Sequence, residues 1–227
     1  MDGVHNIHAM TPARKPSPKP RSTYRHGDLR HALLASGVEL ARGGGPEAVV
    51  LREATRRAGV VPNAAYRHFA DREDLLGAVR AAALAALARA IEAELALVRR
   101  RRDAARVARD RLRAIGSAYV RFAQQEPGLF RTAFSASDRP PAEPDPDPAM
   151  AGGSGLNPFE LLGAVLDEMV ATGTLPTARR PGAEYLAWSS VHGLAMLLID
   201  GPLKRMPAAE REPVVEALLA MVEQGLA

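Results

Sequence analysis

The sequence predicts an all-α protein of about nine helices, in which a small basic N-terminal unit is joined to a larger helical bundle. Apolar residues recur at intervals of three and four along most of the 227 residues, which is the spacing of one face of an α-helix. No segment alternates apolar and polar residues convincingly, as a half-buried strand does. Clusters of glycine and proline separate the periodic segments and mark their ends.

The first 22 residues differ from the rest of the chain. They are rich in proline, lysine, arginine and serine and offer little apolar surface to bury, so we expect a disordered basic arm. Helical periodicity then begins at about Asp28, an acidic residue of the kind favoured at a helix N-terminus. The three glycines at 43–45 are expected to end this first helix.

Start and stop signals predict the next helices. Gly59 ends a helix over residues 47–58, and Pro62 suits the first position of a short helix over 62–69. Asp71 is expected to cap a long helix, with Asp74 three residues later in place of the usual glutamate. Five prolines within residues 135–155 exclude regular structure there. The other expected helices cover residues 71–98, 103–125, 127–134, 158–172, 182–201 and 208–224.

Composition limits the class of protein. The chain has no cysteine, so it has neither disulfides nor thiolate metal sites, and no apolar run is long enough to cross a membrane. We therefore expect a soluble, cytoplasmic protein. Residues 1–80 hold 13 basic against 8 acidic side chains, whereas residues 81–227 hold 17 against 18. This concentration of positive charge at one end indicates a polyanionic partner.

Residues 47–69 have the layout of a helix-turn-helix, whose second helix enters the major groove of double-stranded DNA. Ala65 and Phe69 share one face of that second helix and are expected to be buried. The opposite face carries Pro62, Asn63, Tyr66 and Arg67, followed by His68. Asparagine and arginine can read base edges, and tyrosine, histidine and arginine can hold phosphates.

These residues resemble a known family. The runs Leu51-Arg-Glu-Ala-Thr-Arg-Arg-Ala-Gly-Val60, Tyr66-Arg-His-Phe69 and Asp71-Arg-Glu-Asp-Leu-Leu76 are similar to those of TetR-family transcriptional regulators over about residues 25–80. Trp188-Ser-Ser-Val-His-Gly193 resembles the Trp-x-x-Val-His-Gly element after which one TetR-type C-terminal domain is named. The resemblance implies a homodimer formed through the last two helices, a ligand cavity in the C-terminal domain, and release of an operator when a small molecule binds.

We accordingly divide the chain into an arm (1–22), a helix-turn-helix domain (23–70) and a C-terminal ligand-binding and dimerisation domain (71–227) with a flexible loop at 135–156. Two positions depart from the family pattern. Val61 replaces the usual serine or threonine and cannot cap the helix that reads DNA. Asn63 replaces the usual glycine or alanine, and we expect it to read a base.

Further arginines are candidate phosphate contacts. They are Arg25 before the first helix, Arg52 on the second, and Arg72 at the start of the fourth. Thr55, also on the second helix, is a further candidate phosphate contact. The arm either lies in the minor groove or remains a solvated tail. The run Arg99–Arg102 follows a long helix that carries it away from the groove, so it is interpreted as a solvated helix end.

The C-terminal half offers candidates for a small-molecule pocket and for a subunit interface. The final helix has a wider apolar face than a monomer needs to cover, which predicts pairing with the helix before it and with the same pair in a twin subunit. His192 is either structural or in contact with ligand. The pocket candidates are Phe122, Phe130, Phe134, Phe159, Trp188 and His192.

No nucleophile elbow, phosphate loop or zinc motif is present, so we expect neither an enzyme nor a cofactor. The predicted protein is a ligand-responsive regulator that binds a palindromic operator as a homodimer and acts as a repressor. The alternatives are an architectural DNA binder without an effector, and a helical enzyme or scaffold that does not bind DNA.

Overall fold

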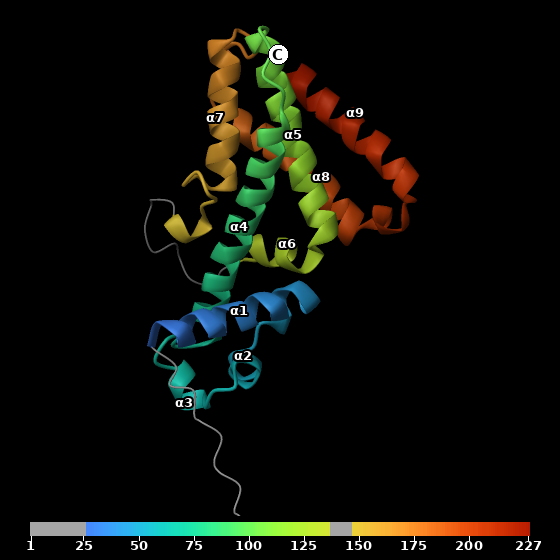
Figure 1. Cartoon of the computed structure of the whole chain (residues 1–227). Helices are drawn as coiled ribbons and strands as arrows, with labels where there is room; N and C mark the ends of the chain where they lie inside the picture. The colour runs from blue at the N-terminus through green and yellow to red at the C-terminus, as the bar shows by residue number, and fades with distance from the viewer. Residues whose placement is uncertain (1–25, 137–146) are drawn as a thin grey trace, which may run out of the picture.

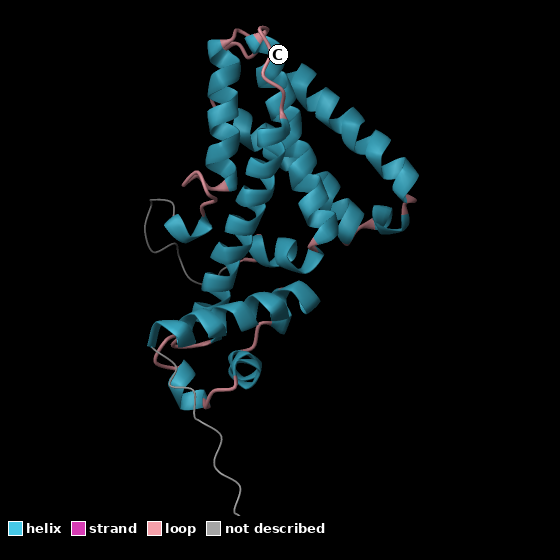
Figure 2. Cartoon of the chain, in the orientation of Figure 1, coloured by secondary structure: helices cyan, strands magenta, loops and turns pink. Residues whose placement is uncertain are grey.

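A computed structural model describes residues 26–136 and 147–227, and all regular structure within these residues is helical (Figure 1, Figure 2). The all-α prediction is therefore confirmed. The predicted arm over residues 1–22 lies outside the described residues, as does the 137–146 part of the predicted loop. No helix among the described residues is long and apolar enough to cross a membrane.

The helices follow the predicted order along the chain. Short 3-10 turns join several of them: η1 (Pro46–Ala48), η2 (Pro148–Met150), η3 (Thr177–Arg179) and η4 (Pro202–Arg205). The α-helices are α1 (His26–Gly44), α2 (Leu51–Ala58), α3 (Pro62–Ala65), α4 (Arg72–Leu97), α5 (Ala104–Gln125), α6 (Pro127–Ala133), α7 (Pro158–Ala171), α8 (Ala183–Ile199) and α9 (Ala208–Leu226).

Acidic caps begin the two longest helices where the sequence predicts. The side chain of Asp71 accepts a hydrogen bond from the backbone N–H of Asp74 at 2.8 Å, and the Asp74 carboxylate accepts one from Ala70 N–H at 2.9 Å. Asp103 caps α5 in the same way, through the N–H of Arg106 at 3.0 Å. Each cap satisfies a backbone donor that the first turn of a helix leaves without an intrahelical partner.

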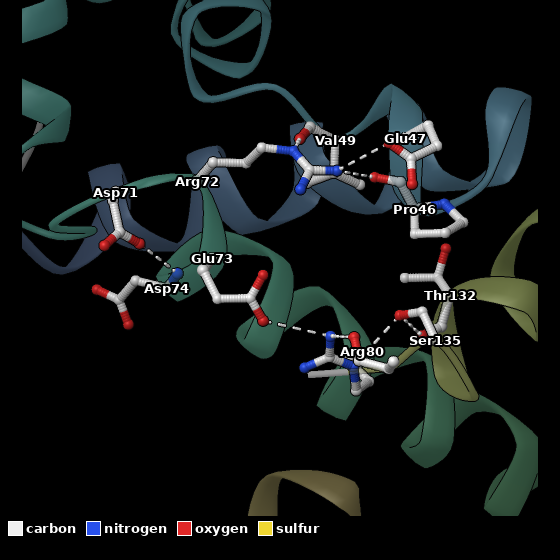
Figure 3. A network of polar contacts seen from close by, with 11 residues as sticks. Pro46, Glu47, Val49, Asp71, Arg72, Glu73, Asp74, Arg80, Thr132 and Ser135 are labelled. Carbon is white, nitrogen blue, oxygen red and sulfur yellow. Dashed lines mark hydrogen bonds and ion pairs between the residues drawn. The ribbon is translucent and has the colours of Figure 1, made fainter. Parts of the chain in front are cut away.

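The second helix begins at Leu51 rather than at residue 47. Residues 46–48 form the turn η1, and Val49 and Val50 are extended. The Arg72 guanidinium explains this break, because it donates hydrogen bonds to the carbonyls of Val49 and Pro46 at 2.9 and 2.7 Å (Figure 3). The Pro46 carbonyl also accepts a hydrogen bond from the Val49 N–H group, which closes η1, so Arg72 attaches η1 and Val49 to the start of α4.

The third helix is also shorter than predicted, ending at Ala65 rather than at Phe69. The backbone N–H groups of both His68 and Phe69 bond to the carbonyl of Ala65, at 2.9 and 3.0 Å, so the chain continues as a turn. Val61 precedes the helix and provides no side-chain cap, as the sequence predicts. A single uncapped turn contributes little stability of its own, so packing must hold α3 in place.

Helix α4 connects the two halves of the molecule. Its 26 residues span about 39 Å, from the α1–α3 unit at one end to the turn into α5 at the other (Figure 1). α1 lies across its lower end, and α5, α7, α8 and α9 form the surrounding bundle. One continuous apolar core runs from Leu33 and Phe69 in the N-terminal unit to Leu219 and Leu226 in α9. A change of packing in the bundle can therefore reach the N-terminal unit without crossing a solvent gap.

Candidate DNA-reading surface and ligand cavity

Helix α3 presents the predicted face to solvent. Pro62, Asn63 and Arg67 are exposed, and the side chains of Val61 and Tyr66 are 68% and 59% exposed. His68 is half-buried. This surface combines base-reading and phosphate-binding side chains on the outside of the helix-turn-helix.

The opposite face of α3 fixes its position. Ala65 and Phe69 are 0% and 1% exposed, which confirms that they anchor the helix in the core. The Arg30 guanidinium of α1 lies 5.2 Å from the centroid of the Phe69 ring and adds a cation–π contact. Burial of Ala65 and Phe69 thus fixes the orientation in which α3 presents its exposed face.

Of the two candidate contacts on helix α2, one is exposed and the other is buried. Arg52 is exposed, but Thr55 is only 2% exposed and its hydroxyl donates to the carbonyl of Arg52 at 2.6 Å. Thr55 is therefore a buried structural residue rather than a phosphate contact. Glu53 binds Arg56 and Arg57 at 2.7 and 3.0 Å, and these hydrogen bonds lower the pKa of Glu53 to about 2. The carboxylate stays ionised and paired on this otherwise basic helix.

The two remaining arginine candidates are Arg72, which bonds to the backbone of the same chain, and Arg25. Arg72, which was expected to contact phosphate, donates to the carbonyls of Pro46 and Val49 and lies 3.7 Å from Glu47, while its side chain remains 41% exposed (Figure 3). Its internal role joins the start of α4 to η1. Arg25 lies outside the described residues.

An apolar cavity of about 460 Å³ lies in the C-terminal bundle, between α4, α5, α6, α7, α8 and α9. Three of the predicted residues, Phe134, Phe159 and Trp188, line it. Its other walls include Leu84, Ile91, Leu112, Ile115, Tyr119, Leu162, Val191, Leu219 and Val222. Such a volume and lining are typical of sites for small organic molecules.

The other three pocket candidates do not line the cavity. Phe122 and Phe130 are 7% and 0% exposed and belong to the core around it. His192 lies behind Tyr119, stacked on the Phe130 ring at a centroid distance of 5.5 Å. These side chains pack behind the wall, and this position agrees with the structural alternative for His192.

Tyr119 is a cavity residue that the sequence analysis missed, and its hydroxyl contacts two of the predicted pocket residues. Its hydroxyl oxygen accepts a hydrogen bond from Trp188 Nε1 at 2.9 Å and lies 2.8 Å from His192 Nδ1. Burial raises the pKa of the Tyr119 hydroxyl and lowers the pKa of His192, so both groups are neutral at pH 7. The partners lie 69 and 73 residues away, so no local pattern could identify Tyr119.

A strap formed by residues 147–157 covers one side of the cavity through Met150 and Asn157. It contains the turn η2, although the sequence predicted no regular structure there. Glu92 of α4 holds the strap, because its carboxylate accepts hydrogen bonds from the backbone N–H groups of Gly153 and Ser154, each at 2.8 Å, and from the Ser154 hydroxyl at 2.5 Å. The strap is thus tied to α4 by one carboxylate.

This attachment should depend on pH. The hydrogen bonds from Ser154 and Gly153 lower the pKa of Glu92, so they stabilise the folded protein above pH 4.5, the usual value, and are lost as the pH falls through the lowered one. We expect the Gly153 and Ser154 amide proton resonances to titrate together with a midpoint below 4.5. Glu92→Gln should abolish that titration, and a midpoint at or above 4.5 would contradict the described contact.

Helix α6 connects the cavity to the N-terminal unit. Phe134 and Ala133 at its C-terminal end line the cavity, whereas Gly128 in its first turn lies against the last turn of α1. A Cβ atom on Gly128 would be 2.2 Å from the carbonyl oxygen of Ala41 and 2.4 Å from that of Arg42. Arg42 also binds Glu126 at 2.8 Å, just before α6 begins.

Arg99–Arg102 are exposed at the turn between α4 and α5, at the end of α4 opposite α1–α3 (Figure 1). This position agrees with the interpretation of the run as a solvated helix end. It separates the run from the α3 surface by the length of α4.

Two family models match the chain. Residues 33–79 match the model described as bacterial regulatory proteins, tetR family, and residues 112–222 match the tetracyclin repressor-like C-terminal domain. The first match contains the helix-turn-helix, and the second contains most of the walls of the cavity. No curated protein matches the sequence.

Solved structures share the fold along nearly the whole chain. A Rhodococcus sp. RHA1 protein of unknown function is 28% identical, with a TM-score of 0.71 over 91% of this chain and 100% of that one. The TetR-family regulator PfmR from Thermus thermophilus is 20% identical, with a TM-score of 0.53 over 86% and 98% of the two chains. The tetR regulator TylP from Streptomyces fradiae is also 20% identical, with a TM-score of 0.51 over 90% and 89%.

Proposed function

Because the chain is a transcriptional regulator that carries both domains of the TetR family, we propose that it is a repressor that releases a palindromic operator when a small molecule fills the cavity. The family consists of bacterial regulatory proteins, so the chain is a regulator rather than an enzyme. The observation that carries the proposal is the physical connection between an exposed α3 surface and an apolar cavity, made by α4 and α6.

We propose that Arg52, Val61, Pro62, Asn63, Tyr66, Arg67 and His68 form the DNA-binding surface of the domain at 23–70. Asn63 and Arg67 would read base edges, and the others would contact phosphates or sugars. Arg25 and the arm at 1–22 would extend this surface. A protein with this role acts in the cytoplasm, where bacterial DNA lies.

Dimerisation through α8 and α9 is supported by their exposed apolar side chains. Leu186 and Leu197 on α8 are 64% and 43% exposed, and Val214 and Met221 on α9 are 37% and 59% exposed. A four-helix interface between two copies would cover these side chains. Its two-fold axis would relate two α3 surfaces and so require a palindromic operator.

The Trp188–Gly193 segment supports assignment to the Trp-x-x-Val-His-Gly type of C-terminal domain. Trp188 and His192 both bond to the Tyr119 hydroxyl, so the motif has a physical role in forming the cavity wall. Val191 also lines the cavity. The tryptophan and the histidine of the motif thus share one polar partner.

Release of the operator would follow from linkage between the two sites. A ligand that fits the cavity best in one dimer geometry stabilises that geometry by its differential binding energy. Displacement of Phe134 would move α6, and Gly128 would carry the movement to the last turn of α1. The two α3 helices of a dimer would then no longer match the spacing of their half-sites.

The proposal is tested by selecting bound duplexes from a random DNA pool with the full chain. We expect one enriched palindrome, bound at least about a thousandfold more tightly than random DNA at physiological salt. Titration of that duplex against a panel of small molecules should then identify compounds that weaken binding. Enrichment without any such compound would support an architectural DNA binder, and absence of enrichment would contradict sequence-specific recognition.

A further inference from the structure

We propose that the cavity binds an uncharged, mainly apolar ring compound that donates a hydrogen bond, from a hydroxyl or an N–H group, to the oxygen of Tyr119. The inference rests on the proposed function, since it names the class of molecule to which the regulator would respond. It depends on three properties of the cavity: the charges on its walls, the hydrogen bonds of Tyr119, and the arrangement of its aromatic rings.

The walls offer no partner for a charged ligand. Among the described residues that line the cavity, Arg113 is the only one with a formal charge. Its guanidinium binds Glu223 of α9 and lies 4.0 Å from Glu216, and Glu223 is also 3.6 Å from Arg109. An anionic ligand would therefore compete with two carboxylates, and a cationic ligand would meet no acidic wall residue. Burial of an unpaired charge is costly, so a neutral ligand is favoured.

The hydrogen bonds of Tyr119 leave one acceptor position. Its oxygen carries one O–H donor and two lone pairs. Trp188 Nε1 donates to one lone pair. We assign the tautomer of His192 that carries its proton on Nε2, so that the O–H group of Tyr119 donates to Nδ1, because the opposite tautomer would leave the hydroxyl proton without a protein partner. His192 is half-buried, so its Nε2–H group can reach solvent. No described side chain contacts the second lone pair of Tyr119, and because Tyr119 and its partner Trp188 both line the cavity, we infer that this lone pair is the acceptor offered to a ligand.

Asn157, a polar residue of the strap that lines the cavity, is also uncharged. The side-chain oxygen of Asn157 accepts hydrogen bonds from the backbone N–H groups of Phe159 and Glu160 at the start of α7, at 2.9 and 3.0 Å. The oxygen of Asn157 is therefore already engaged in capping α7. Apart from Arg113, which is paired with Glu223, the polar wall residues carry no charge, and this agrees with a neutral ligand.

Aromatic rings determine the shape of the site. Phe159 lies 6.0 Å from Trp188 and 5.5 Å from Tyr185 by ring centroids, and Phe134 lies 5.9 Å from Trp188. Three helices or their ends therefore contribute rings to one wall. Such surfaces favour offset or edge-to-face packing of a flat ring. The cavity volume of about 460 Å³ suits a compound of drug-like size.

The test uses three probes of similar shape: para-cyclohexylphenol, its methyl ether and para-cyclohexylbenzoate. Trp188 is the only tryptophan of the chain and lines the cavity, so its fluorescence reports occupancy directly. We expect the phenol to bind at least about tenfold more tightly than either the ether or the benzoate, because the ether lacks the donor and the benzoate is charged. Calorimetric titration checks the same ratios independently.

Two tyrosine variants locate the effect. Tyr119→Phe should reduce the phenol-to-ether preference to about onefold by removing the acceptor. Tyr185→Phe is the matched control, because this tyrosine also lines the cavity but is 63% exposed, and it should keep the preference. If Tyr119→Phe fails to fold, the phenol-to-ether and phenol-to-benzoate affinity ratios of the unmodified protein still test the inference. Equal binding of phenol and ether, tighter binding of the benzoate, or no binding of any probe would overturn the inference.

Operator binding separates failure of the inference from failure of the proposed function. A phenol that binds with the expected preference but leaves operator affinity unchanged would support the ligand class and contradict ligand-induced release. Release by a charged compound, with none of the three probes bound, would support a ligand-responsive repressor and overturn the ligand class.

Discussion

Gly128→Ala is expected to lower the free energy of unfolding by about 3 kcal/mol, the upper end of the usual cost of overpacking a buried site. The new methyl group would lie 2.2 and 2.4 Å from two backbone carbonyl oxygens in the last turn of α1. Backbone atoms cannot rotate aside as the tip of a side chain can. Either α6 or the end of α1 must move, and the variant should also bind the operator more weakly because α1 supports α2 and α3.

Chemical denaturation measures the stability change, and operator titration at a temperature where the variant is folded measures the functional one. Gly77→Ala is the matched control. It lies in α4 with nothing within 4 Å of the added Cβ, so it should stabilise the protein by about 0.5–1 kcal/mol through helix propensity. Equal stability of the two variants would contradict the close approach of α6 to α1.

Asn63→Ala is expected to reduce discrimination between operator variants by about 1–3 kcal/mol at one base-pair position of each half-site. The side chain is exposed at the second position of α3, where it can reach a base edge. Because it is exposed, its loss leaves no cavity in the core, and the thermal stability should remain unchanged. The effect should therefore be confined to recognition.

The measurement compares the affinities of the variant and the unmodified protein for the selected palindrome and its single-base substitutions. Arg52→Ala is the control, since the loss of a phosphate contact should weaken all sequences about equally and reduce the salt slope by about one. If Asn63→Ala discriminates as well as the unmodified protein does, Asn63 does not read a base.

Local signals predicted the helices because each depends on residues close together in the chain. The caps at Asp71 and Asp103 bond to backbone groups three residues away, and Gly59 ends α2 in the left-handed conformation. Periodicity likewise predicted burial of Ala65 and Phe69. These features require no knowledge of the rest of the fold.

The errors arose where distant residues decide the structure. Arg72 binds the carbonyls of Pro46 and Val49, across 26 and 23 residues of chain, where the sequence predicted the start of the second helix. The cavity depends on the six helices α4 to α9, which meet only after folding, so its aromatic residues could be predicted as a group but not sorted into wall and core. Thr55 was predicted wrongly because it lies three residues after Arg52, on nearly the same side of a short helix, and only the packing of the fold exposes Arg52 and buries Thr55.

Helix α9 separates the cavity from a surface open to other molecules. Leu219 and Val222 line the cavity, whereas Val214 and Met221 on the same helix are exposed. During evolution, a substitution on the cavity side of α9 that changes ligand preference would therefore also move the exposed side chains on the outer side of the same helix. Substitutions on the strap or on α7 can change the ligand without that constraint. We accordingly expect new ligand preferences to arise first in the strap and α7, and the cavity face of α9 to vary together with its outer face.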